Sequence, residues 1–134
     1  MSTIFITQIL LSGFVSGIII FQSFLAAPIV FSFLEKDQSR IFIRKIFPRI
    51  FILLTCIGFA MLIVNLCFGN DSNIYAYIGT ITFILPLACF LMIPATNNAT
   101  DGNNKSRFQL LHRLSVIFTL IVLLVNLIAP LFLR

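Results

Sequence analysis

The residues best suited to chemistry are His112, the only histidine of the chain, and Ser115. An imidazole titrates near neutral pH, binds metals or anions, and can act as a base for a hydroxyl. Residues three apart share one side of a helix, so the two side chains are expected to lie together. A catalytic base needs a third group that orients it, and none accompanies this pair. We therefore predict a binding site here and no catalytic residue.

Metal-binding and redox residues are scarce. One histidine cannot supply both axial ligands of a bis-histidine haem. Cys56, Cys67 and Cys89 have neither Cys-x-x-Cys nor Cys/His ligand spacing. The four acidic residues all fall outside the apolar stretches, so nothing predicts a proton relay within a membrane. We expect neither a metal nor a cofactor, and we do not predict an enzyme.

Membrane helices must position these residues, because the composition is too apolar for a soluble domain. Of the 134 residues 60% are hydrophobic and only 10% are charged, whereas soluble domains average about half apolar and a quarter charged. Four apolar stretches, residues 4–33, 50–68, 74–95 and 110–132, approach or exceed the roughly 20 residues that a spanning helix needs. The sequence therefore predicts an all-α integral membrane protein, with one four-transmembrane-helix bundle over residues 1–134.

Positive charge is concentrated on one side of the predicted bundle. Eight of the nine cations lie in or beside the connections that precede residues 50 and 110: Lys36, Arg40, Arg44, Lys45, Arg49, Lys105, Arg107 and Arg113. The opposite side has only Arg134. Positive loops face the cytoplasm, so both termini are predicted outside, periplasmic in a bacterial inner membrane. We expect the cations to bind anionic lipid headgroups and no nucleic acid, because no soluble element could read a groove.

The connections have their own patterns. Residues 35–50 alternate apolar and cationic side chains in a way that predicts a short amphipathic helix in the membrane interface, with a solvated basic loop as the alternative. Pro48 would then occupy the first turn of the second span. Residues 69–73 predict a tight turn, and residues 96–106 predict a polar loop. The first span is long enough to tilt or kink, and Pro28 is the expected place for a kink.

A face of small residues runs along the first span. Ser12, Gly13, Ser16 and Gly17 lie together in sequence, and the two glycines form a G-x-x-x-G motif. Such a motif lets the backbone of another helix approach closely. The partner could be a helix of the same bundle or the first span of a second copy in a homodimer. Packing inside the bundle is the interpretation favoured from the sequence.

Polar residues near the cytoplasmic side could converge on one pocket. The candidates are Gln22, Ser23, Pro94, Asn97, His112 and Ser115. Residues 112, 119 and 126 are seven apart, which puts them on one stripe of the last helix, and polar stripes in membranes turn inward. An inward-facing His112 is therefore expected. The alternative is an interfacial histidine bonded to a loop carbonyl.

Four short motifs, in order along the chain, carry a resemblance to a known family. They are "AAPIVF" at residues 26–31, "FP" at 47–48, a "P..N.A.D.G" pattern at 94–102, and "F..LHR.SV" at 108–116. The chain resembles the small membrane proteins of domain-of-unknown-function family 4149, whose eukaryotic relatives are transmembrane-protein-205-like. It departs from the family at Thr119, where an asparagine is common. The resemblance implies a four-helix membrane fold and no established reaction.

The sequence thus predicts a small membrane protein that acts as a binding or accessory module with a cytoplasm-facing polar pocket. One alternative is a supernumerary subunit of a larger membrane complex. The other is a His112-dependent membrane enzyme similar to the anthrone-oxygenase-related proteins. Anionic lipids, other membrane subunits or a second copy of the chain are the expected partners.

Overall fold

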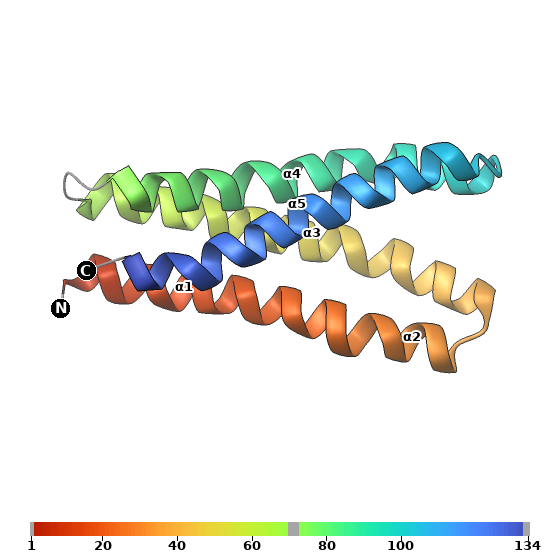
Figure 1. Ribbon diagram of the computed structural model, residues 1–134, viewed down its shortest axis with the longest axis horizontal. Helices are drawn as coiled ribbons and strands as arrows, with labels where there is room; N and C mark the ends of the chain where they lie inside the picture. Colours follow the sequence, from red (N-terminus) through yellow and green to blue (C-terminus); the bar gives the residue numbers. More distant parts are fainter. Residues whose placement is uncertain (1, 70–72, 133–134) are drawn as a thin grey trace.

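The computed structural model describes residues 2–69 and 73–132, and helices are the only regular secondary structure of this part of the chain (Figure 1). The elements are α1 (Thr3–Ile20), η1 (Phe21–Ala26), α2 (Ala27–Phe33), α3 (Lys36–Phe68), α4 (Asn73–Asp101) and α5 (Lys105–Phe132). The first three run on as one helix, so four helices are long and apolar enough to cross a membrane. The predicted all-α membrane bundle is confirmed. The turn predicted at 69–73 lies largely outside the described residues.

Side-chain caps mark the ends of the helices. The Ser2 hydroxyl accepts a hydrogen bond from the Phe5 N–H (3.4 Å), which begins α1. Glu35 and Gln38 form a reciprocal capping box at the start of α3. Between α4 and α5, Asn103 adopts a left-handed backbone conformation (φ 53°), which asparagine tolerates better than most residues. The Asn104 side chain then accepts from the Arg107 N–H (3.1 Å).

The irregularity expected near Pro28 takes the form of a π-helical turn. η1 occupies the six residues before Ala27, whose N–H donates to the carbonyl of Gln22, five residues back. Proline has no N–H to donate, and its ring crowds the carbonyl four residues earlier. The turn before Pro28 widens, and the helix continues as α2 without a break.

Two segments predicted to lie between the spans, an amphipathic helix at 35–50 and a polar loop at 96–106, belong largely to longer helices. Residues 35–50 do not form a separate interfacial helix, because α3 runs from Lys36 to Phe68 with Pro48 inside it. Phe42, Ile46 and Ile50 keep the four-residue spacing of one helix face, so a single apolar face continues into the span. Likewise α4 extends to Asp101, where Thr100 bonds back to the Thr96 carbonyl (3.0 Å). Such bonds satisfy polar side chains within a helix and shorten the loop to residues 102–104.

The most extensive packing joins α3 and α4. Gly58 explains why they approach so closely: a Cβ there would lie 2.4 Å from the Phe83 backbone nitrogen. Gly79 is similarly close to Leu62, whose side chain would be 3.0 Å from an added Cβ. The sequence singled out Gly13 and Gly17 as the close-packing glycines. In the structure that role belongs to Gly58 and Gly79.

The buried core occupies the half of the bundle near the two chain ends. One apolar cluster contains Ile4, Met61, Tyr75, Ile78 and Ala129, and the next contains Val15, Ile19, Leu54, Val122 and Leu123. We call this half the terminal end. The other half, with the connections at residues 34–35 and 102–104, is the basic end, because all eight cations of the described chain lie there.

The bundle opens toward the basic end. Figure 1 shows the helix of α1 and α2 spreading away from α4 and α5 in that direction. α2 touches α3 only near its own end, where the Ser39 hydroxyl donates to the carbonyl of Val30 (3.2 Å). Val30 is the one buried residue of α2. The faces that this helix would cover in a closed bundle are therefore left accessible.

Candidate functional site

The six residues expected to form a polar pocket are spread over different surfaces. Gln22 is half-buried and lines a groove between α1 and α3, whereas Ser23, on the next position of η1, is exposed. Pro94 is exposed on α4, and Asn97, one turn further on, is half-buried. Of the six, only Gln22 contributes to this groove.

His112 does not have the inward-facing environment that its stripe predicts. The imidazole is exposed and stacks on Phe108 of the same helix, with ring centroids 5.7 Å apart and ring planes 7° apart. The stripe itself has the expected phase, because Ser115 is half-buried and Asn126 is buried. The covering helix is what differs, because α1 packs against α5 whereas η1 and α2, which continue it, do not. Among the described residues, no three His, Cys, Asp or Glu side chains meet.

Where the stripe is covered, it ties the helices together. The Asn126 side-chain amide donates to the Thr82 hydroxyl and to the Val122 carbonyl, both at 2.9 Å. On α1 the amide of Gln8 donates to the Met61 carbonyl of α3 (3.0 Å). Gln8 was missed in the sequence, although it stands four residues before Ser12 and shares its face. These buried polar residues are structural cross-links between helices.

The small-residue face of α1 divides into two. Ser12 and Ser16 are buried against the bundle, but Gly13 and Gly17 are exposed. A Cβ added at either glycine would meet no atom within 4 Å. Neighbouring helix positions differ by about 100°, so a serine and the following glycine cannot face the same partner. Internal packing of the G-x-x-x-G motif, favoured from the sequence, is wrong for this chain.

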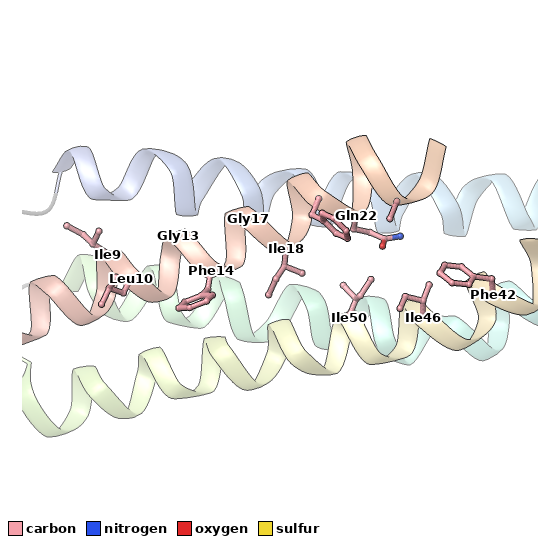
Figure 2. Close-up of a pocket in the computed structure, with 12 residues that line it drawn as sticks. Ile9, Leu10, Gly13, Phe14, Gly17, Ile18, Gln22, Phe42, Ile46 and Ile50 are labelled. Atoms are coloured by element: carbon pink, nitrogen blue, oxygen red, sulfur yellow. The ribbon is translucent and has the colours of Figure 1, made fainter. Parts of the chain in front are cut away.

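The two glycines lie in an apolar groove of about 800 Å³ between α1–η1 and the first half of α3 (Figure 2). Its lining residues are Ile9, Leu10, Gly13, Phe14, Gly17, Ile18, Phe21, Gln22, Ala26, Phe42, Ile46 and Ile50. Gln22 is the one polar side chain among them, and Figure 2 shows its amide directed into the space between the two helices. The surface suits an apolar ligand with one polar group near Gln22.

Two cations lie on the stretch of α3 that borders the Gln22 end of this groove, although neither is among its lining residues. Lys45 and Arg49 are exposed on α3, each directly before a groove-lining residue, Ile46 or Ile50. Arg44, on another side of α3, pairs with Asp101 and ties α3 to α4. The hydrogen bond from Arg44 holds the pKa of the Asp101 carboxyl below its ordinary value. This is the one ion pair within the described chain. The charges of Lys45 and Arg49 are therefore not neutralised by any acidic side chain of that part of the chain.

A second, polar hollow of about 540 Å³ lies on the first turns of α5. It is lined by Asn104, Ser106, Arg107, Gln109, Leu110 and Arg113. Arg107 and Arg113 are exposed, and Asn104 already caps the helix. The hollow is a shallow, solvated surface of the basic end, where the predicted contact of these cations with lipid headgroups stays a prediction.

Comparison with known proteins identifies the family of the chain. Residues 10–105 match the family described as Domain of unknown function (DUF4149). That stretch contains nearly the whole groove and ends before His112 and Ser115. The chain is also 30% identical over 119 residues to an "Uncharacterized protein" of Aquifex aeolicus (strain VF5), covering 87% of this chain and 86% of that protein. No solved structure matches the chain. With its four apolar helices and the match over α1 to α4, the chain belongs to the DUF4149 family of undefined biochemical role.

Proposed function

We propose that this protein is a non-enzymatic binding module of the membrane, and that the groove between α1 and α3 holds an apolar, membrane-embedded ligand. The observation that carries the proposal is the open backbone at Gly13 and Gly17. Without side chains there, a ligand can contact the helix backbone along its length, as a neighbouring helix does in G-x-x-x-G pairs. Ligand sites are mostly apolar with a few polar groups, which is the character of this groove.

The cytoplasm-facing polar pocket expected from the sequence is replaced by this groove as the binding site. A role for His112 as an enzymatic base has less support, because the imidazole is exposed and stacked on Phe108. We further propose that the protein resides in a bacterial inner membrane with its basic end in the cytoplasm. The eight cations at that end support this orientation.

A role as a subunit of a larger complex is the second candidate. Its support is the apolar surface of η1 and α2, where Phe24, Phe31 and Phe33 are 70%, 65% and 82% exposed. These side chains lie toward the basic end, on the helix that diverges from α4 and α5 (Figure 1). A neighbouring membrane protein would cover them, and in that case a photo-crosslinker at Phe31 should capture a protein.

Site-specific photo-crosslinking tests the binding function. A benzophenone amino acid replaces Phe14 in the groove or, as the control, Leu124 on α5. The side chain of Phe14 is 65% exposed and that of Leu124 is 53% exposed. After irradiation in native membranes, intact-mass spectrometry should show one dominant adduct at position 14. Position 124 should give a low-yield mixture of bulk lipids. Equal yields with the same adduct pattern at both positions would contradict a specific groove ligand.

A further inference from the structure

The cations at one end of the groove identify its occupant more closely. Building on the binding function above, we infer that the groove binds one anionic phospholipid. An acyl chain would lie over Gly13 and Gly17, and the phosphate group would lie near Lys45 and Arg49. Both cations are exposed, and neither forms an ion pair within the described chain. The facing helix, residues 3–33, has no charged residue that could neutralise them.

The length of the groove suits an acyl chain. It extends along α1 from Ile9 to Gln22, thirteen residues at 1.5 Å each, or about 20 Å. One leaflet contributes about half of the roughly 30 Å hydrocarbon core. A chain anchored near Lys45 can therefore follow the groove for the full depth of one leaflet.

The polar groups of the site also follow the order of the parts of a phospholipid, from acyl chain to ester to phosphate. Gln22, near the basic end of the groove, is the only polar side chain among the lining residues. Its amide can donate to the ester carbonyl that joins the acyl chain to the headgroup. The cations on the same stretch of α3 then meet the phosphate, since Lys and Arg near a membrane surface attract anionic lipids.

A second copy of the chain fits this surface less well. A two-fold dimer brings the same patch of both copies together. Docking through Gly13 and Gly17 would then set Lys45 and Arg49 opposite their own counterparts at equal depth. These like charges would repel each other, whereas an anionic headgroup neutralises them.

The test is native mass spectrometry of the full chain released from nanodiscs of mixed phosphatidylglycerol and phosphatidylcholine. The wild-type protein should retain one phosphatidylglycerol. The double variant Lys45→Gln/Arg49→Gln should lose about tenfold in preference for that lipid over phosphatidylcholine. The control Lys36→Gln/Lys105→Gln removes the same charge from exposed positions outside the groove and should keep the preference.

A second pair of variants tests the acyl-chain part. Gly17→Leu fills the groove, where an added Cβ meets nothing within 4 Å, so the fold should survive and the bound lipid should be lost. Thr80→Leu, at an exposed position of α4, should keep it. The inference is overturned if phosphatidylcholine binds equally well, if both charge-removing pairs reduce binding equally, or if the Phe14 adduct is a second copy of the chain. In the first two cases a lipid adduct specific to Phe14 would leave the binding function standing, whereas a second copy of the chain at Phe14 would overturn the binding function as well.

Discussion

At the scale of single residues, glycines decide which surfaces are closed and which are open. Gly58 lies against the backbone of α4, and Gly17, in a more conspicuous motif, faces the groove. The two positions differ in their neighbours and not in their intrinsic chemistry. A small residue permits a close approach, but the approach happens only where a second helix reaches the same depth.

Substitution by leucine should separate the two glycines clearly. In Gly58→Leu the new Cβ would lie 2.4 Å from the Phe83 nitrogen, so α3 and α4 must move apart. We expect a loss of about 3 kcal/mol or more in stability, at the upper end of overpacking costs. Gly17→Leu should stay near wild type, because its Cβ enters open space. Thermal unfolding in detergent measures both, and a larger loss for Gly17→Leu would contradict the packing described here.

At the scale of elements, the length of α3 is the main departure from the expected organisation. Hydropathy alone divides residues 35–68 into an interfacial segment and a span, but the two share one apolar face and form one helix. This continuity makes Phe42 and Ile46 a wall of the groove. It also puts Pro48 in a helix interior, where proline costs a backbone hydrogen bond and crowds residue 44.

Pro48→Ala distinguishes one continuous helix from two. In a continuous α3 the alanine restores an N–H that can donate to the Arg44 carbonyl and relieves the proline penalty, about 3 kcal/mol in full. We expect a stability gain of about 1 kcal/mol or more, because membrane helices compensate part of that penalty. Thermal unfolding in nanodiscs gives the measurement. No gain would fit a proline in the first turn of a separate helix, where the missing N–H costs nothing.

At the scale of the whole molecule, the bundle is closed at its terminal end and open at its basic end. The buried clusters and the Asn126–Thr82 hydrogen bond lie in the closed part. The groove lies beside it and is open to the bilayer, and Lys45 and Arg49, near its basic end, form no ion pair with the described residues. A scaffold of this kind can keep its fold while the open surface binds and releases a ligand.

The orientation of the whole molecule is testable by labelling. In a variant without native cysteines, Ser2→Cys and Asn103→Cys place one thiol at each end of the bundle. If the basic end is cytoplasmic, as the cation distribution predicts, a membrane-impermeant maleimide should label position 2 in intact spheroplasts. Position 103 should react only after lysis. The reverse pattern would put the cations outside and contradict the predicted orientation.

The sequence allowed much of the fold to be predicted, because hydropathy reports helix number and helical phase directly. The phase of the stripe from His112 to Asn126 was correct, and only its far end proved buried. Whether His112 is buried depends on a covering helix more than eighty residues away in sequence. No local sequence pattern predicts where that helix bends away from the bundle. For the same reason the serines and glycines of α1 could not be assigned to different surfaces.

The π-helical turn of η1 has a consequence for how such a site can originate. A π turn accommodates one more residue than the α turn it replaces, so η1 has the form of a single-codon insertion in an ordinary helix. Phe21, Gln22 and Ala26, which shape the cation-flanked part of the groove, all belong to it. Removing one residue would leave an α-helix and rotate α2 by about 100°, carrying Val30 out of its buried position. The placement of the groove residues in η1 thus depends on one inserted residue, a small genetic step from a plain membrane helix.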